Sequence, residues 1–302
     1  MQFEKWQALG NDYLVVERDR LPVPLTPARA RLLCDPHLGP GGDGVLELSP
    51  PTEPGTVAAL RIINPDGSEA ELSGNGAREA IMYLVRRGWT DRTQFSITTA
   101  AGEIRPTILS ETTCRVDMGR ARTVSDDHDV PGTDGRGALD TAETLHPSAA
   151  DATPRRWRYQ HVKIGNPQCA IRVDDLETLE ALDLPAIGPG IEHHPVFPNR
   201  TNVSWYCELE PGVIRARIFE RGVGETMSSG TGASGAAVAY VLSGGGSGAG
   251  DAEHEAVTVR LDGGELTVDV ADDLHVDLTG WAVPVYAAQA SDELVAALRE
   301  LD

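Results

Sequence analysis

An internal repeat constrains this chain more than any other feature of its sequence. The segment RIINPDGSEAELSGNGAREA (Arg61–Ala80) aligns without a gap with RIFERGVGETMSSGTGASGA (Arg217–Ala236), and eight of the twenty positions are identical. A second pair, LGND around Asn11 and IGNP around Asn166, has almost the same offset. Self-similarity at a fixed spacing indicates a repeated structural unit. We therefore expect two related α/β domains that face each other across a cleft.

Composition and charge exclude several classes of partner. The 302 residues are enough for two medium domains, and 40% of them are apolar. A net charge of −20, from 46 acidic and 26 basic residues, makes nucleic acid and anionic membranes unfavourable partners. No apolar run approaches the ~18 residues of a membrane span. The N-terminus lacks a basic region followed by an apolar stretch, so we expect no secretory signal and a cytoplasmic protein.

The cysteines and histidines do not have the spacing of a metal site. Four cysteines (Cys34, Cys114, Cys169 and Cys207) are scattered without a CxxC pair, which indicates reduced, packed thiols rather than a disulfide framework or zinc ligands. His193 and His194 are adjacent in a Pro-rich stretch, with no regularly spaced ligands near them. We therefore predict no metal.

Periodicity and turn residues predict similar elements in both halves. Helices are expected at 25–36, 76–89, 176–182, 233–243 and 291–301. Strands are expected at 13–17, 44–49, 59–64, 95–100, 114–119, 155–165, 169–175, 213–220, 256–261, 264–270 and 275–281. The acidic, Gly- and Pro-rich stretch 125–156 indicates a domain junction or a long surface loop, and we also expect loops at 185–203 and 244–251.

Each copy of the S-G-x-G motif precedes a predicted helix. A serine there is a preferred N-cap, and glycine allows close approach of the backbone, so the motif has a purely structural interpretation when it occurs alone. Two such helix N-termini that pointed into one cleft would bind a carboxylate from both sides. Ser73 and Ser229 would then flank the α-carbon of a bound amino acid, as a two-base racemase requires. The chain has only two lysines, Lys5 and Lys163, so we expect no pyridoxal phosphate and no other organic cofactor.

Several motifs together resemble one known family over nearly the whole chain. They are FEKWQALGNDY, GPGGDGV, RIINPDGSEAELSGNGAR, IGNPQCAI, FPNRTNV, ARIFERGVGETMSSGTGAS and LTGWAVPVY. The chain resembles diaminopimelate epimerases, which implies a cofactor-independent enzyme that converts LL- to meso-diaminopimelate in lysine biosynthesis. It also implies an α/β (α+β) fold of two pseudosymmetric domains, each a barrel-like, mostly antiparallel sheet around a central helix. We place them at 1–122 with 278–302 and at 123–277. The family suggests a homodimer.

The resemblance implies a set of site residues. Ser73 and Ser229 occupy the positions of the family's two proton-transfer residues. The positions that match substrate contacts are Asn11, Asn64, Asn166, Asn202, Glu220 and Arg221, and those that match contacts to the substrate carboxylate are Gly74, Asn75, Gly230 and Thr231. Their chemistry agrees, since Arg221 can pair with a carboxylate in a bidentate manner and Glu220 can hold an ammonium group. Asn11, Asn64 and Asn166 also lie in turn-like contexts, which is their alternative interpretation.

The two serines depart from the family, which has cysteine at both positions. A thiol ionises near pH 8.5, whereas a serine hydroxyl is a far weaker acid and needs an adjacent base. Glu69 and Glu225, four residues before each serine, are the local candidates for that base.

This departure leaves three hypotheses open. The protein is an epimerase that uses serines or nearby carboxylates, a related isomerase or dehydratase that acts on another amino acid, or a non-catalytic amino-acid-binding protein. Serine hydroxyls that only cap their own helices would favour the third hypothesis.

Overall fold

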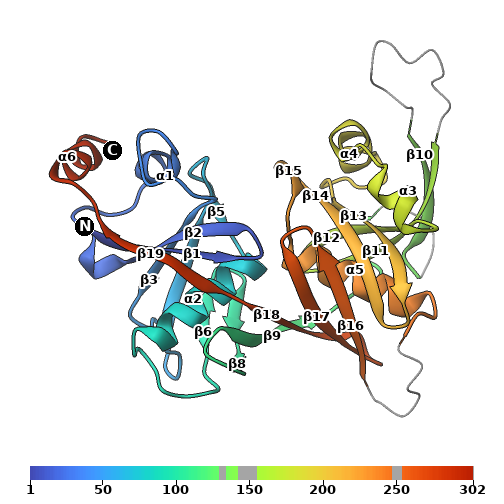
Figure 1. The fold of residues 1–302 in the computed structure, drawn as a ribbon, viewed down its shortest axis with the longest axis horizontal. Helices are drawn as coiled ribbons and strands as arrows, with labels where there is room; N and C mark the ends of the chain where they lie inside the picture. Colours follow the sequence, from blue (N-terminus) through green and yellow to red (C-terminus); the bar gives the residue numbers. More distant parts are fainter. Residues whose placement is uncertain (129–133, 142–154, 247–253, 302) are drawn as a thin grey trace. The chain divides into compact units, whose positions relative to one another are not determined.

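Two compact units make up the structure, a computed structural model that describes residues 1–128, 134–141, 155–246 and 254–301. Unit 1 comprises Met1–Asp117 and Thr279–Asp302, and unit 2 comprises Met118–Leu278 (Figure 1). The chain thus leaves the first unit once and returns to it near its end.

Unit 1 contains a sheet with one long central helix and two shorter helices. Its elements are β1 (Gln2–Ala8), β2 (Asn11–Glu17), a 3-10 turn η1 (Arg18–Arg20), α1 (Pro27–Cys34), β3 (Val45–Ser49), β4 (Ala58–Ile63), β5 (Glu69–Ala70), α2 (Gly74–Arg86), β6 (Ile97–Thr99), β7 (Gly102–Ile104), β8 (Pro106–Ile108), β19 (Val283–Gln289) and α6 (Asp292–Glu300). Strand β9 (Thr113–Arg120) leads out of this unit.

Unit 2 repeats this arrangement with longer strands. Its elements are β10 (Arg136–Thr141), β11 (Arg155–Ile164), β12 (Asn166–Arg172), α3 (Leu176–Glu180), α4 (Leu184–Glu192), β13 (Asn202–Glu210), β14 (Val213–Glu220), β15 (Gly224–Thr226), α5 (Gly230–Leu242), β16 (His254–Leu261) and β17 (Gly264–Ala271). Strand β18 (His275–Trp281) leads back towards unit 1.

The two sheets have the same order of strands. In unit 1 the order is β19-β1-β2-β3-β4-β6-β7, with β5 paired to β4; in unit 2 the segment β10-β11-β12-β13-β14-β16-β17 corresponds to it, with β15 paired to β14. Pairing directions match at each step: β2/β3 and β12/β13 are parallel, as are β4/β6 and β14/β16, and the neighbouring pairs are antiparallel. The predicted pseudosymmetric, mostly antiparallel fold is confirmed.

Each sheet wraps a central helix that is buried over most of its length. Helix α2 is buried from Gly74 to Leu84, and α5 from Gly230 to Tyr240. A helix buried on all sides needs small or apolar residues around its whole circumference, and α5 (GTGASGAAVAYVL) is composed of them. The glycines set the helix-to-sheet spacing, because a Cβ on Gly235 would lie 2.8 Å from Cβ of Gln168 on β12.

This close approach predicts the effect of one methyl group. Gly235→Ala should lower the free energy of unfolding by about 1–3 kcal/mol, because the new Cβ overlaps Cβ and Cγ of the buried Gln168 side chain. Gly190→Ala is the matched control in α4, where the nearest atom to a new Cβ, Cγ2 of Thr141, is 3.8 Å away. That change should stabilise by about 0.5–1 kcal/mol through helix propensity. Urea unfolding of both variants measures the contrast, and equal effects would contradict it.

Some local predictions were wrong. The expected loop at 185–203 contains α4, whose N-cap Asp183 accepts a hydrogen bond from the backbone N–H of Ala186. Pro185 falls in the first turn, where proline costs no hydrogen bond, although Pro189 lies inside the helix. The expected junction at 125–156 contains strand β10, while 129–133 and 142–154 lie outside the described residues, as does most of the loop expected at 244–251. Strands β1, β13 and β19 were not predicted, nor were the short strands β5, β7, β8 and β15.

The structure also bears on the cysteines and on membrane insertion. All four cysteines are free and buried, as the sequence predicted. Within the described ranges, no helix has both the length and the apolar character of a membrane span.

Candidate active site

Ser73 lies at the N-terminus of the central helix of unit 1. It is the N-cap of α2, and its Oγ accepts a hydrogen bond from the backbone N–H of Gly76 at 3.1 Å. A second donor, the Tyr13 hydroxyl on β2, is 3.2 Å from the same oxygen. Because the Ser73 oxygen accepts from both groups, its own O–H hydrogen remains available to donate. Two donors also stabilise negative charge on that oxygen.

A chain of hydrogen bonds holds two predicted site residues beside Ser73. Arg78 on α2 donates to Oδ1 of Asn75 at 2.5 Å, and Asn75 donates to Oδ1 of Asn11 at 3.3 Å. Asn11 in turn donates to the Asp43 carboxylate at 2.7 Å. Arg78 is fully buried, and burial lowers the pKa of its guanidinium. The structure therefore brings Asn11, Asn75 and Ser73 into one contiguous polar region, and Arg78 and Asp43 orient its amides.

Asn64 has a different local role. It opens the turn between β4 and β5, where its backbone carbonyl accepts from the N–H of Gly67 at 2.9 Å. Its side-chain nitrogen donates to Oγ of Ser68 at 3.0 Å. Gly67 has a φ of 84°, which favours glycine at that position. The turn interpretation of Asn64 thus holds, and a substrate contact by this residue is left as a prediction.

Ser229 is the counterpart of Ser73 in unit 2. It is the N-cap of α5 and accepts from the backbone N–H of Gly232 at 3.2 Å. Its Oγ also lies 3.4 Å from Oγ1 of Thr231. Ser229 and Thr231 are buried. As in unit 1, neither a carboxylate nor an imidazole from the described residues hydrogen-bonds this serine.

Asn202, Glu220 and Arg221 lie close together in unit 2. The backbone N–H of Arg221 donates to Oδ1 of Asn202 at 2.8 Å, and the Asn202 side-chain nitrogen donates to the carbonyl of Pro167 at 3.3 Å. Arg221 donates through Nη1 to the carbonyl of Asn199 at 2.8 Å. Glu220 accepts from the Thr226 hydroxyl at 3.0 Å. Asn202 therefore fixes the backbone of Arg221, and Nε and Nη2 of its side chain have no hydrogen-bond partner among the described residues, so that they can bind a carboxylate.

Asn166 lies at the start of β12, next to a residue that the sequence did not single out. Gln168 donates through Nε2 to Oδ1 of Asn166, and it occupies the position in unit 2 that Tyr13 occupies in unit 1. Gln168 is fully buried, and its Oε1 has no hydrogen-bond partner among the described residues. An unpaired buried carbonyl is costly, so Gln168 is a further candidate for substrate contact in this half.

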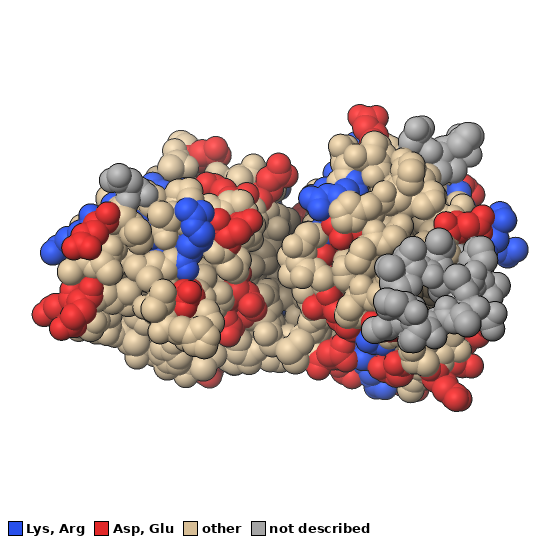
Figure 2. All heavy atoms as spheres, turned by 90° about the horizontal axis from the view of Figure 1, so that it is seen from above, with Lys and Arg blue, Asp and Glu red and all other residues tan. Residues whose placement is uncertain are grey.

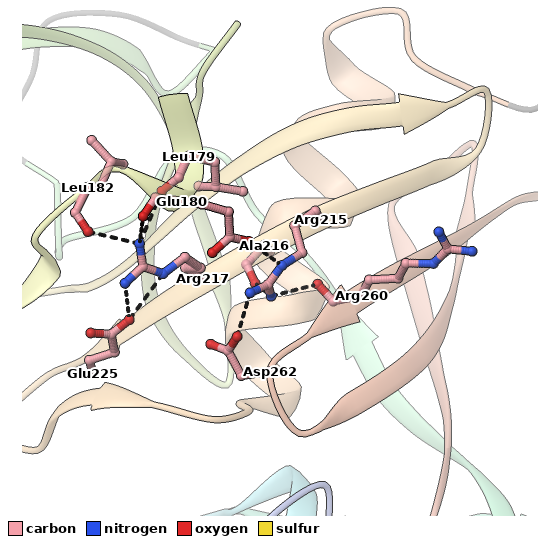
Figure 3. Close-up of polar contacts among 9 residues, drawn as sticks. All are labelled: Leu179, Glu180, Leu182, Arg215, Ala216, Arg217, Glu225, Arg260 and Asp262. Carbon is pink, nitrogen blue, oxygen red and sulfur yellow. Dashed lines mark hydrogen bonds and ion pairs between the residues drawn. The ribbon is translucent and has the colours of Figure 1, made fainter. Parts of the chain in front are cut away.

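The arginine and glutamate of the repeat form the same clamp in both units. Arg61 pairs with Glu69 at 2.9 Å across β4 and β5, and Arg217 pairs with Glu225 at 2.6 Å across β14 and β15. Figure 3 shows Arg217 between Glu225 and carbonyl oxygens at the end of α3, the closest being that of Leu182 at 2.8 Å. Glu69 and Glu225 thus bind arginines that brace the hairpin before each serine. Their predicted role as bases for the serines is not supported by any contact.

The four cysteines do not replace the missing thiols. Burial, followed by the charges of Asp43 and Asp12, raises the pKa of Cys34 to about 12. Burial also raises the pKa of Cys114 to about 12, that of Cys169 well above its ordinary value, and that of Cys207. A thiol that stays protonated is a poor proton acceptor, so these residues are packing groups.

His161, a buried histidine of unit 2, predicts a pH-dependent stability for this unit. His161 stacks on His128 with 4.6 Å between ring centroids, and its Nε2 lies 2.8 Å from Oγ of Ser125. Burial, and then the neighbouring His128, lower the pKa of His161 to about 4. The ordinary pKa of histidine is near 6.5, so between pH 6.5 and 4 the unfolded chain binds a proton that the folded chain does not. Folding stability therefore falls as pH falls through this window.

The size of this effect is measurable. From pH 6.5 to pH 5, the chain should lose about 2 kcal/mol more stability than His161→Phe, a variant that keeps an aromatic ring at this position but cannot titrate. Urea unfolding at the two pH values gives the difference. His193→Gln, at an exposed residue of the same unit, is the control and should behave like the unsubstituted chain. An equal pH dependence in His161→Phe would show that His161 is not buried as a neutral base.

Solved structures with this fold come from several enzyme groups. A PhzF-family phenazine biosynthesis protein from Bacillus anthracis matches with a TM-score of 0.65 and 17% identity, over 96% of this chain and 99% of that one. A hydroxyproline epimerase from Agrobacterium vitis also matches at 0.65 and 17%, over 95% and 91%. These matches show the fold of the chain, a pair of sheet-rich units that each contain a serine-capped central helix.

The sequence comparisons identify one family. The family model described as "Diaminopimelate epimerase" matches residues 3–124 and 161–284. A diaminopimelate epimerase from Synechococcus sp. (strain JA-3-3Ab) is 38% identical over 295 residues, covering 97% of this chain and 99% of the relative. One from Pelotomaculum thermopropionicum is 37% identical, covering 96% and 98%. The chain belongs to the diaminopimelate epimerase family.

Proposed function

We propose that this protein converts LL-diaminopimelate to meso-diaminopimelate without a cofactor, by proton transfer at the α-carbon. Membership of the family over nearly the whole chain supports the substrate. The observation that carries the mechanism is the serine-capped central helix, which occurs once in each unit with the same cap geometry. A two-base reaction needs one proton-transfer group for each face of the α-carbon, and the two units supply one such group each.

The helix N-termini supply the electrostatic part of the reaction. The first N–H groups of a helix have no intrahelical partner, and they carry a partial positive charge. In this proposal, the N–H groups at Gly74 and Gly230 bind the substrate carboxylate. They stabilise the negative charge that develops there when the α-proton leaves. Asn75 and Thr231 add side-chain polar groups at the same helical turn.

The remaining polar residues would hold the distal end of the substrate. Diaminopimelate has a second amino-acid centre, with an ammonium and a carboxylate. Arg221 would pair with the distal carboxylate, and Glu220 with the distal ammonium. Asn64, Asn166 and the Asn202 amide that fixes Arg221 would complete this region. The protein would then bind both amino-acid centres of the substrate, which favours diaminopimelate over amino acids with one zwitterionic centre.

The capping bonds favour a second candidate function, a protein that binds an amino acid but does not catalyse its conversion. Both serine oxygens accept from their own helices, as a purely structural cap would. Capping uses an acceptor site of the oxygen and leaves the hydroxyl proton, so the same geometry also permits Ser73 and Ser229 to donate a proton. Family membership favours the epimerase, and a direct assay separates the two functions.

The assay is solvent exchange at the α-carbon. The purified chain is incubated in D2O with LL-diaminopimelate at low and high salt, and deuterium incorporation is followed together with meso product. We expect both. Ser73→Ala and Ser229→Ala should each abolish epimerisation and retain exchange from only one of the two isomers, which assigns the faces. Loss of a cap costs about 1 kcal/mol, so thermal unfolding verifies that both variants fold. Binding without exchange would overturn the epimerase in favour of the binding protein.

A further inference from the structure

Each unit has a cavity at the C-terminal end of its central helix, away from the serine cap. The cavity of unit 1 has a volume of about 370 Å³, and its lining includes Tyr83 and Arg87 at the end of α2. The cavity of unit 2 has a volume of about 500 Å³, and its lining includes Ala239 and Ser243 at the end of α5. The two cavities correspond in the repeat, because strands β19 and β1 line the first and strands β10 and β11 line the second. They can therefore be compared directly.

The cavity of unit 1 is neutralised by its own side chains. Glu4 and Arg87 form an ion pair, and Glu17 pairs with Arg20 at 2.9 Å. Tyr83 also donates to Glu17 at 2.7 Å. Two carboxylates and two guanidinium groups thus face each other, and no further ion is needed to balance them.

The cavity of unit 2 has a different balance of charge. Its lining contains Arg136, Arg158 and Arg172, and among the described residues no acidic side chain. Arg136 donates to the carbonyl of Leu242 at 2.8 Å, and Arg172 pairs with nearby Glu208 at 2.7 Å. In the part of the chain that the structure describes, Arg158 has no hydrogen-bond or ion-pair partner. Three guanidinium groups therefore have a single carboxylate between them.

The strand register places these arginines on one face. Arg158 pairs with Ala138 on β10, and Gln160 pairs with Ala170 on β12. The observed β11/β12 pairing ends there, and two further residues along each strand in the same register would place Arg158 opposite Arg172, which itself pairs with Tyr206 on β13. Like charges on directly opposite positions of neighbouring strands are destabilising. In a chain of net charge −20, whose acidic side chains are prominent on the face shown in Figure 2, this local concentration of arginine favours the binding of an anion.

The floor of the cavity indicates the kind of anion. It is formed by buried residues with small or apolar surfaces, among them Ala170, Tyr206 and Ala239. The arginines lie around it and are exposed. A volume of this size suits a small molecule rather than a single ion. Arginine binds carboxylate and phosphate groups in a bidentate manner, so two arginines can hold two acidic groups or one phosphate.

We infer that the cavity at the end of α5 binds a small organic anion that has an apolar body and is either a dicarboxylate or a phosphate monoester. Arg158 is the principal ligand, with Arg172 and Arg136 beside it. The site lies at the opposite end of α5 from Ser229 and is therefore separate from the proposed active site. This inference does not depend on the proposed function.

Isothermal titration calorimetry of the full chain tests the site with two probes, glutarate and phenyl phosphate, at constant ionic strength. We expect saturable binding of at least one probe, and its identity distinguishes a carboxylate ligand from a phosphate ligand. Glutaramide and phenol, the uncharged analogues, should not bind. Arg158→Gln should weaken binding about tenfold or more, since it removes a charge-assisted bidentate partner. Arg158 is exposed and without a described partner, so this variant should fold normally.

Two controls locate the binding. Arg156→Gln removes the same charge from the same strand, outside the cavity lining, where Arg156 lies 4.0 Å from Asp140. It should bind as the unsubstituted chain does. Because glutarate resembles part of an amino-diacid, the titration is repeated with Arg221→Gln, and retained affinity excludes the proposed active site. The inference is overturned if neither probe binds at millimolar concentration, or if Arg158→Gln leaves the affinity within twofold.

Discussion

Replacing both Ser73 and Ser229 with cysteine should raise the rate of epimerisation about 10²- to 10⁴-fold. A thiol has an ordinary pKa near 8.5, and a helix N-terminus lowers that value further. A serine hydroxyl ionises far above this range, and no carboxylate or imidazole among the described residues hydrogen-bonds either serine. Each cysteine would stand at the same N-cap, beside the same backbone N–H groups. The double variant therefore gains ionisable proton carriers without any change in the rest of the site.

The measurement is the initial rate of α-deuterium incorporation and of isomer conversion, starting separately from LL- and meso-diaminopimelate. Single variants should give an intermediate gain, because the slower remaining face limits the reaction. Ser228→Cys is the control for a thiol one residue away, and it should leave the rate near that of the unsubstituted chain. A double variant that is no faster would show that proton transfer does not pass through these positions.

The difference between the two serines makes this experiment more informative. Ser73 receives hydrogen bonds from Gly76 and Tyr13, whereas Ser229 is buried and, among the described residues, has Thr231 as its one side-chain hydrogen-bonding contact. Tyr13 can stabilise an ionised oxygen or thiolate at position 73 by donating a hydrogen bond to it. Its counterpart Gln168 has no such contact with Ser229. We therefore expect the larger single gain from Ser229→Cys, at the face with the weaker natural support.

The repeat made the fold predictable from the sequence. Two copies of the strand–turn–helix segment around Ser73 and Ser229 were sufficient to predict two related domains, and the matched strand pairings agree. The central helices were predictable from local sequence, since α2 has an apolar stripe at helical spacing and α5 consists almost wholly of glycine, alanine and other small or apolar residues. Strand β13 was missed because its residues are buried on both faces, so that NVSWYCELE lacks the alternation typical of a half-exposed strand.

The candidate site was predictable only in part. Motifs gave the residues at helix N-termini and in turns, where local sequence determines conformation. They did not give the partners that orient these residues. Arg78, Asp43 and Tyr13 act across 3, 32 and 60 positions of the chain. For Glu225 the sequence identified the residue but suggested the wrong role. Its matched position in the repeat suggested a base for Ser229, whereas the structure shows that it pairs with Arg217 and braces a hairpin.

Arg221→Gln should raise the KM for LL-diaminopimelate about 10²-fold and change kcat far less. Removing one partner of a hydrogen-bonded charge pair costs about 2–5 kcal/mol, and each 1.4 kcal/mol corresponds to tenfold in affinity. The Arg221 backbone is fixed by Asn202 and one of its nitrogens by Asn199, so its side chain is preorganised to bind a carboxylate. Arg221→Lys keeps the positive charge but cannot donate two parallel hydrogen bonds to a carboxylate. Its KM should therefore lie between that of the unsubstituted chain and that of Arg221→Gln.

The comparison that decides the role of Arg221 uses binding as well as kinetics. Arg122→Gln removes an exposed arginine from the same unit and should leave KM unchanged, so that a general effect of charge is excluded. If Arg221 instead held the reacting end of the substrate, its loss would lower kcat as strongly as it raises KM. A ligand that lacks one amino group separates the same alternatives. L-2-Aminopimelate lacks the distal ammonium and keeps both carboxylates, so it should lose the contribution of Glu220 and retain its sensitivity to Arg221→Gln. Equal affinity of this ligand for both proteins would remove Arg221 from the distal end of the site.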